Sequence, residues 1–344
     1  MDFSVKSELK KFKTIYAQQA SGKSFATVPD MLKAMGQDGM YPLTQVTAKE
    51  SFLNNLGWSE KLVEEFIMGA MLVNYGQSVN SIDAFTAYVS LAGVDDGSLW
   101  SVVGGNWKIP MKVLEASGAS LHEDEVTAVT RIENDGKVQY KLTTLAEGDV
   151  PGNFDVVIVA NPLNVSKTKY ENFPTNVYTT SATTPYHRTV AEFVQGRINT
   201  EFFGVSENDR TFPTTILTTE MEGAPFKFCS VAVEIPSEAT QDQVKDYIKP
   251  IADDPVRVWK VFTPEPMTEE QKAEMFSEIK DQATFDWLAY PEYQPPEQFP
   301  PFIIDNGVFY INTIEKAASA MEMSAIGAKN VALLAREYLL KSAE

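Results

Sequence analysis

Residues 155–160 read Asp-Val-Val-Ile-Val-Ala, and Asn161-Pro162 follow directly. Five of these six consecutive residues are apolar, so they cannot alternate between the core and water. This pattern is typical of a parallel strand that is covered on both faces, and the proline ends it. We therefore predict a buried parallel strand over 155–160, of the kind that a doubly wound α/β sheet requires.

Upstream of this strand the sequence predicts a hairpin preceded by helices. Residues 125–132 and 137–142 are β-branched runs joined by Glu133-Asn134-Asp135-Gly136, and Asp-Gly favours the left-handed turn that a hairpin needs. Residues 4–92 carry apolar side chains at helical spacing and a helix-start pattern, Thr47-x-x-Glu50. We expect a helical block there, and a shorter helix over about 110–117.

Downstream, the polar and apolar residues of 187–263 alternate, which predicts a mostly antiparallel sheet. A capping pattern at Thr268 predicts a helix, and the prolines of 287–301 predict an extended aromatic loop. Two short strands and a long helix over about 321–340 end the chain. The fold class is therefore α/β (α+β): an incomplete doubly wound domain plus an antiparallel-sheet domain.

Composition excludes several classes of protein. The 344 residues are 44% apolar, enough for a globular core, and 29 Lys and Arg against 47 Asp and Glu give a net charge of −18. Nucleic acid is therefore not an expected partner. No run approaches the roughly 18 apolar residues of a membrane span, and the first residues lack the apolar centre of a signal peptide. Cys229 is the only cysteine, so no internal disulfide forms.

The residues that usually carry hydrolytic or metal chemistry are sparse. His122 and His187 stand 65 positions apart without a Cys/His cluster, so no zinc site of ordinary spacing and no metal is expected. Each histidine is expected either at the surface or in the core with its hydrogen bonds satisfied. Neither a G-x-S-x-G turn nor a P-loop lysine motif occurs, which disfavours hydrolases and NTPases. The catalytic residues stay unknown.

Two segments have small residues just before a predicted helix, where a ligand can approach the backbone closely. Gly104-Gly105 precedes the predicted short helix, and the small-residue run 317–320 precedes the last helix. Backbone amides at such positions can hold a phosphate or the edge of a flavin. Taken singly, a Gly-Gly pair is more often only a turn, and a small-residue run is more often only tight packing.

Several longer motifs occur in the order found in prenylcysteine oxidases. They are NYGQS (74–78), IDAF (82–85), SLW (98–100), GGN (104–106), DVVIVANPL (155–163), WLAYP (287–291), Tyr293, PPE (295–297) and AASAMEMSAI (317–326). The sequence resembles that family over nearly its whole length. The family opens with a strand and a G-x-G-x-x-G turn on the cofactor pyrophosphate, and this sequence contains no G-x-G-x-x-G. That opening is expected upstream of Met1.

The resemblance implies a FAD-dependent enzyme that oxidises the thioether of farnesyl- or geranylgeranyl-cysteine with O2. The products would be cysteine, a prenyl aldehyde and hydrogen peroxide, in the degradation of prenylated proteins in a lysosome, vacuole or secretory compartment. The candidate cofactor-binding residues are Gly104, Gly105, Val126, Ala160, Asn161, Ser319, Ala320 and Met321. The candidate substrate-binding residues are Trp287, Tyr290 and Tyr293, whose alternative role is to pack the domain interface.

The implied domains are a helical block of the substrate or cap region (1–95), the rest of a FAD-binding domain (96–165), a substrate domain (166–300) and the last FAD-binding strands and helix (301–344). Two other functions stay open: a related two-domain flavin amine oxidase or desaturase, and a non-catalytic fragment. We expect the chain alone neither to hold FAD tightly nor to oxidise farnesylcysteine. Prenyl length and oligomeric state are not determined by these residues.

Overall fold

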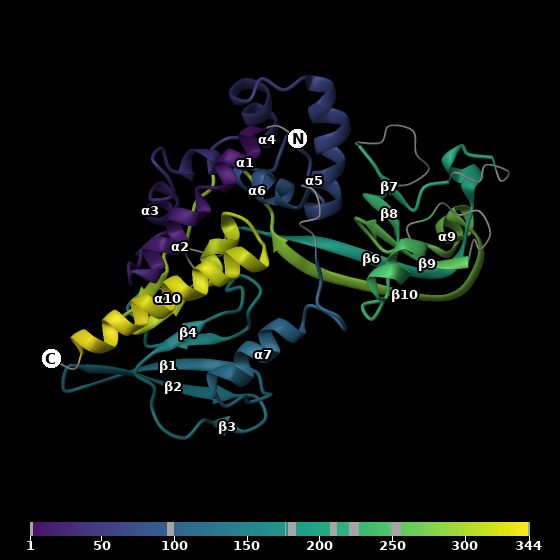
Figure 1. Ribbon diagram of the computed structural model, residues 1–344. Coiled ribbons are helices and arrows are strands. Elements are labelled where there is room, and N and C mark those ends of the chain that lie inside the picture. Colours follow the sequence, from purple (N-terminus) through teal and green to yellow (C-terminus); the bar gives the residue numbers. More distant parts are fainter. Residues whose placement is uncertain are drawn as a thin grey trace.

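The computed structural model describes residues 3–94, 100–175, 177, 184–206, 212–219, 227–247, 249 and 256–342. A helical block, three sheets and a long C-terminal helix make up this part of the chain (Figure 1). In Figure 1 the C-terminal helix α10 (Met321–Lys341) runs between the helical block and a four-stranded sheet, while a five-stranded sheet extends to the other side. None of the described helices is both long and apolar enough to cross a membrane.

The helical block confirms the helices expected over 4–92. Thr47 accepts a hydrogen bond from the backbone N–H of Glu50, as its capping pattern predicts. The run around Leu62 to Ile67 is a π-helix rather than an α-helix. The elements are α1 (Phe3–Leu9), α2 (Phe12–Ala20), α3 (Val28–Lys33), η1 (Tyr41–Thr44), α4 (Ala48–Glu50), η2 (Ser51–Asn55), η3 (Leu62–Ile67), α5 (Met68–Tyr75), α6 (Ala84–Ser90) and η4 (Leu91–Val94).

The predicted hairpin is confirmed as β1 (Val126–Asn134) and β2 (Lys137–Thr144), and the predicted short helix as α7 (Lys108–Ser117). The turn takes the left-handed backbone that its sequence indicates, with φ of 51° at Asp135 and 80° at Gly136. The hairpin belongs to a four-stranded sheet of order β3-β2-β1-β5, completed by β3 (Gly148–Asp149) and β5 (Lys169–Glu171).

The strand predicted over 155–160 is shorter and less buried than its composition suggested. It is β4 (Val157–Val159), and it pairs in parallel with β12 (Val308–Tyr310) as expected. Because β4 is the edge of a three-stranded sheet of order β11-β12-β4, with β11 at Ile303–Asp305, no described strand covers its outer side. Val159 is buried but Ile158 is 43% exposed, so the prediction of burial over the whole stretch was wrong.

The predicted antiparallel sheet is confirmed. Its order is β10-β6-β9-β8-β7, and every neighbouring pair is antiparallel. The strands are β6 (Tyr186–Ile198), β7 (Thr215–Leu217), β8 (Ser230–Val233), β9 (Val256–Thr263) and β10 (Phe276–Pro291), with η5 (Thr200–Phe203), α8 (Gln241–Tyr247) and α9 (Glu269–Met275) between them. The capping box at Thr268 is present.

The extended loop expected over 287–301 begins later than predicted. Trp287 to Pro291 are the last residues of β10, where they pair with the beginning of β6. The aromatic residues of this stretch suit a strand, and the proline that ends it lies at the last position of the ladder. Only the residues after Pro291 leave the sheet.

The segment just before α10, residues 312–320, is held from two sides. It comprises η6 (Asn312–Lys316) and the four small residues that follow. The hydroxyl of the buried Tyr293 accepts from the Ser319 N–H at 2.7 Å and donates to the Glu315 carbonyl at 3.0 Å. From the helical block, the Tyr75 hydroxyl donates to the Ser319 carbonyl at 2.9 Å. Helix α10 then begins at Met321, as predicted.

A buried carboxyl group supports the same segment. The Thr86 hydroxyl oxygen lies 2.7 Å from the carbonyl of Ala317 and 2.5 Å from Oδ2 of the fully buried Asp83. One hydroxyl hydrogen cannot serve both oxygens. If Asp83 is protonated, its carboxyl donates to Thr86, and Thr86 donates to Ala317. This agrees with the pKa of Asp83, which burial raises to about 8.

The helical block meets the five-stranded sheet where α5 ends. Gly76 follows α5 in the left-handed conformation, with φ of 62°. A Cβ atom at this position would lie 2.2 Å from Nε2 of His187, the second residue of β6. Glycine therefore meets two requirements here, the backbone conformation and the space for the imidazole ring.

The Asp83 carboxyl predicts a specific dependence of stability on pH. Because its pKa is higher in the folded than in the unfolded state, its contribution to stability is full below about pH 4 and declines as the pH rises through about 8. The nearby Glu297 charge raises the pKa, while the Thr86 hydrogen bonds and Lys316 lower it. We expect Asp83→Asn to flatten the free energy of unfolding, measured by urea denaturation, between pH 4 and pH 8, by a few kcal/mol in total. Parallel profiles of the two proteins would contradict a protonated Asp83.

Gly76→Ala is expected to destabilise the protein more than Gly118→Ala does. Both glycines end a helix with nearly the same left-handed φ, 62° and 67°, but nothing lies within 4 Å of a Cβ at Gly118. The shared conformational cost is about 1 kcal/mol. The additional loss at Gly76, roughly 1–3 kcal/mol from the clash with His187, is measured as the difference between the two unfolding free energies. Equal losses would show that the imidazole moves aside freely.

Candidate functional site

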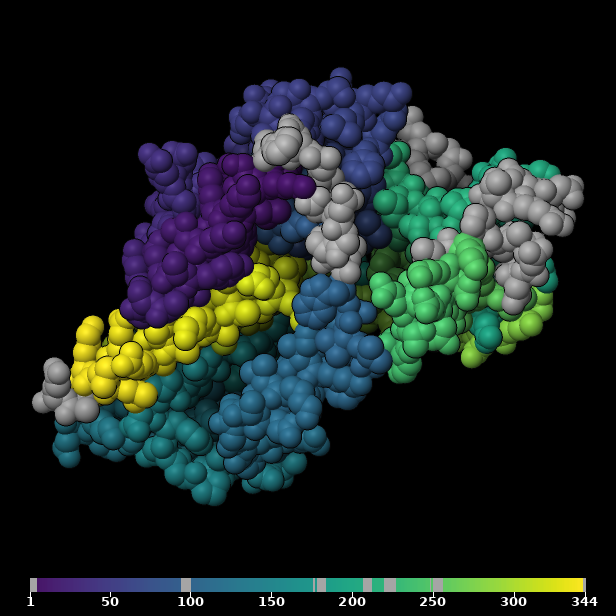
Figure 2. Space-filling view, viewed as in Figure 1, coloured from purple at the N-terminus to yellow at the C-terminus, as the bar shows by residue number. Residues whose placement is uncertain are grey.

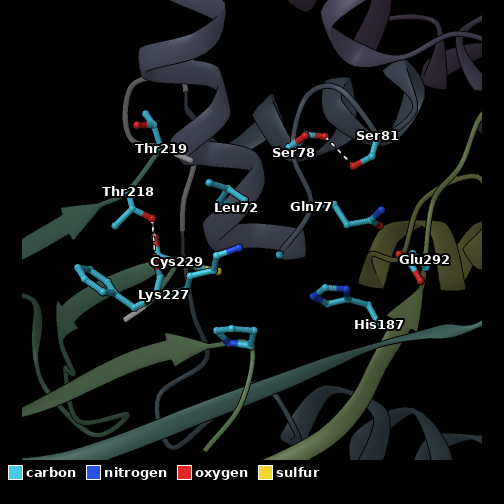
Figure 3. Close-up of a pocket in the computed structure, with 13 residues that line it drawn as sticks. Leu72, Gln77, Ser78, Ser81, His187, Thr218, Thr219, Lys227, Cys229 and Glu292 are labelled. Carbon is cyan, nitrogen blue, oxygen red and sulfur yellow. Dashed lines mark hydrogen bonds between the residues drawn. The ribbon is translucent and has the colours of Figure 1, made fainter. Parts of the chain in front are cut away.

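A cavity of about 600 Å³ opens where α5, the start of β6, the end of β10 and the β7–β8 edge come together (Figure 3). Its size suits a small molecule. The wall is partly apolar, through Leu72, Phe228 and Pro264, and otherwise polar. The remaining lining residues are Gly76, Gln77, Ser78, Ser81, His187, Thr218, Thr219, Lys227, Cys229 and Glu292.

His187 lines this cavity, and Tyr290 packs behind it. They are direct cross-strand neighbours in the β6–β10 ladder, and their rings stack with centroids 5.6 Å apart and an interplanar angle of 2°. Burial lowers the pKa of His187, although the Glu292 charge opposes the shift, so the ring is neutral at pH 7. Within the described ranges, no hydrogen bond reaches the imidazole. Its ring nitrogens are therefore available to a bound molecule.

Backbone hydrogen bonds at or next to the two charged residues of the wall limit where their side chains begin. Glu292 follows the last residue of β10, and its N–H donates to the Pro185 carbonyl at 2.9 Å. Next to Lys227, the carbonyl of the buried Phe228 accepts from the Thr218 hydroxyl at 2.7 Å. Among the residues that the structure describes, neither Lys227 nor Glu292 has an ion-pair partner. Burial raises the pKa of the Cys229 thiol, which keeps it protonated.

Tyrosines connect this cavity with the start of α10. The Tyr290 ring packs edge-on against Tyr75 at 5.2 Å, and Tyr75 packs edge-on against Tyr293 at 5.6 Å. The Tyr75 and Tyr293 hydroxyls both bond the backbone of Ser319. The structure therefore brings together two predicted substrate residues, Tyr290 and Tyr293, and one predicted cofactor residue, Ser319.

The start of α10 has the properties that a flavin edge requires. Ala320 precedes the helix without a side-chain cap, so amides of the first turn have no side-chain acceptor there. Met321 is 56% exposed, while Ala317 and Ala318 are fully buried behind it. Small residues allow close approach, and the positive end of a 21-residue helix suits the electron-rich edge of a flavin. These residues fit the implied cofactor.

The Gly104–Gly105 turn is more self-contained than its sequence suggested. The N–H of Gly104 donates to the Ser237 carbonyl, and that of Gly105 to the Val102 carbonyl. Cβ atoms at the two positions would meet the side chains of Lys108 and Trp107, respectively. Both amides are already bonded, so this turn offers a ligand less than the start of α10 does. The proposed cofactor role of Gly104 and Gly105 stays a prediction.

The other predicted residues are separate from the cavity. Val126 begins β1, where its carbonyl accepts from the Thr168 hydroxyl at 2.9 Å. Ala160 and Asn161 are exposed beyond the end of β4. Trp287 is 44% exposed within β10 and does not line the cavity. Their cofactor or substrate roles stay predictions.

Sequence reasoning missed the imidazole and both charged residues of the cavity. His187 was expected to be satisfied in the core or at the surface, and Lys227 and Glu292 were not singled out. Of the motifs that carry the family resemblance, NYGQS supplies three lining residues, Gly76, Gln77 and Ser78. The described residues contain no group of three His, Cys, Asp or Glu side chains that could hold a metal ion.

Solved structures with a similar fold include two amine oxidases. A cyclohexylamine oxidase from Brevibacterium oxydans superimposes with a TM-score of 0.52 at 15% identity, covering 95% of this chain and 75% of that one. A putrescine oxidase double mutant gives 0.54 at 14% identity, over 99% and 76%. Identities this low show the fold alone. They agree with the predicted fold class, that of a two-domain α/β flavoenzyme.

Sequence comparison gives closer relatives. Prenylcysteine oxidase 1 of Homo sapiens is 35% identical over 342 residues, 96% of this chain and 65% of the relative. A prenylcysteine oxidase 1-like protein of Bos taurus is 31% identical over 340 residues, with the same coverage. The chain thus spans about 65% of the length of these relatives. The sequence profile described as prenylcysteine lyase matches residues 1–344, and the chain therefore belongs to the prenylcysteine lyase family.

Proposed function

We propose that this chain forms the substrate side, and part of the cofactor side, of a FAD-dependent oxidase of prenylcysteine. The observation that carries the proposal is the position of Tyr75. Its hydroxyl bonds the Ser319 carbonyl beside the start of α10, and its ring packs on Tyr290, which stacks on His187 in the cavity. One side chain thus joins the element that suits a flavin to a cavity that suits a small molecule.

The proposed reaction is balanced by water and oxygen. The thioether R–S–CH2–R′, one water and one O2 give the thiol R–SH, the aldehyde R′–CHO and H2O2. FAD, when bound, supplies the chemistry that removes a hydride from the carbon next to sulfur and delivers two electrons to O2. The hydride step does not require a catalytic acid.

The residues of this chain would bind the substrate, orient it and exclude water. Burial raises the pKa values of Tyr75 and Tyr293, and raises that of Tyr290 to about 12, so all three stay protonated. Their edge-on rings pack between the cavity and the start of α10. His187, neutral and without a hydrogen bond in the described ranges, can accept a proton from water that adds to the oxidised carbon.

Exposed apolar surface supports docking of a dinucleotide-binding segment like that of the family. Every described side chain of α7 is at least partly exposed, including Val113 at 64%, and Trp107 before it is 63% exposed. Helix α7 lies on the face seen in Figure 2. Strand β4 presents an unpaired edge with Ile158 exposed. A parallel strand added to β4 and a layer over α7 would bury both.

The test is to co-express the chain with the dinucleotide-binding segment of a relative and to purify the complex. We expect flavin absorbance, and peroxide release with S-farnesylcysteine. Ala320→Phe at the start of α10 should remove most of the flavin absorbance, because it fills the approach to the helix end. The matched control is Ala325→Phe, at an exposed position of the same helix.

Two results would contradict the proposal. Equal flavin content in the two variants would remove α10 from the cofactor site. A yellow complex that releases peroxide with cyclohexylamine or putrescine, but not with S-farnesylcysteine, would instead favour an amine oxidase.

A further inference from the structure

We propose that Lys227 and Glu292 bind the carboxylate and the ammonium group, respectively, of the cysteine part of the substrate. The cavity between them would therefore hold the amino-acid end of an S-alkylcysteine rather than its apolar chain. This inference rests on the proposed function and names the residues that recognise the substrate's polar end.

Charge balance within the cavity supports this assignment. Among the lining residues that the structure describes, Lys227 and Glu292 alone are of the Asp, Glu, Lys and Arg types, one of each sign. The other titratable side chains add no charge at pH 7, because burial lowers the pKa of His187 and raises that of Cys229. The described lining residues therefore carry one positive and one negative charge, within a chain of net charge −18. This pair of charges matches a zwitterion better than a simple anion or cation.

The two charged residues face the cavity from different elements. Figure 3 places Lys227 with Thr218 and Cys229 on one side of the cavity, and Glu292 with His187 on the other. Glu292 has little freedom at its backbone because its N–H is bonded to Pro185. Lys227 has a long side chain that can adjust its reach. Neither charge has a partner in the described ranges, so ligand binding would not have to break an ion pair.

Two other polar residues of the wall, Gln77 and Thr218, are engaged elsewhere. The Gln77 amide donates to the Tyr293 carbonyl and accepts from the Tyr293 N–H, both at 2.9 Å. The Thr218 hydroxyl bonds the Phe228 carbonyl. Lys227 and Glu292 therefore remain the strongest groups available to a charged ligand. With the amino-acid end between them, the sulfur would lie toward Tyr290 and the start of α10.

Binding measured by isothermal titration calorimetry tests the inference with three ligands. S-farnesyl-L-cysteine carries both charges, its methyl ester lacks the carboxylate, and its N-acetyl derivative lacks the ammonium group. Lys227→Met should weaken binding of the parent compound about tenfold or more and leave the ester unaffected. Glu292→Gln should weaken the parent similarly and leave the N-acetyl derivative unaffected.

The crossed design separates a direct contact from a loss of fold. A variant that binds its matching derivative as the unmodified protein does is folded, and each ligand pair forms a double-mutant cycle. Lys61→Met and Glu147→Gln, at exposed residues that do not line the cavity, are the matched controls. The complex with the dinucleotide-binding segment is used throughout.

Three outcomes would overturn the inference. If the parent compound binds the unmodified protein and neither variant weakens it, the cysteine end is recognised elsewhere while the proposed function stands. If Lys227→Met weakens the ester as much as the parent, the lysine acts without a carboxylate contact. If none of the three ligands binds the unmodified complex, the proposed function fails together with the inference.

Discussion

The contact of Tyr293 with the segment before α10 is the interaction on which the site depends. This side chain is 1% exposed, and its hydroxyl both accepts from Ser319 and donates to Glu315. Its backbone is bound in turn by the Gln77 amide of the helical block. Three parts of the chain that are distant in sequence are therefore fixed at one residue. Because buried hydrogen-bonding groups are costly to leave unpaired, this junction has little freedom to rearrange.

Local chemistry made much of the fold predictable. The Asp135–Gly136 turn, the capping box at Thr268 and the start of α10 depend on neighbouring residues, and all three were found where the sequence placed them. The errors lie where tertiary pairing decides. Ile158 is exposed while Val159 is buried, so one face of β4 is left uncovered. Trp287 belongs to a strand because β6 extends far enough to pair with it. The local sequence does not determine either feature.

The candidate site was predictable only in part, for the same reason. Tyr290 and Tyr293 were chosen from an aromatic stretch that resembles the family, and they do meet Ser319 through Tyr75. His187 and Glu292 reach the cavity because the register of β6 against β10 places the ends of those strands side by side. Lys227 lies just before β8, towards the edge of the sheet opposite β10. Single charged residues at such spacing carry no recognisable signal.

The length and position of β10 have a further consequence. This 16-residue strand, about 50 Å long, leads to the lining residue Glu292 and also forms an outer edge of the five-stranded sheet. A free edge of that length would readily recruit a strand from another molecule. Three register shifts interrupt its pairing with β6, and Glu278, Lys280, Asp281 and Asp286 place charges along it. These charges and irregularities oppose edge-to-edge aggregation, so the sheet can end at the strand that leads to the cavity.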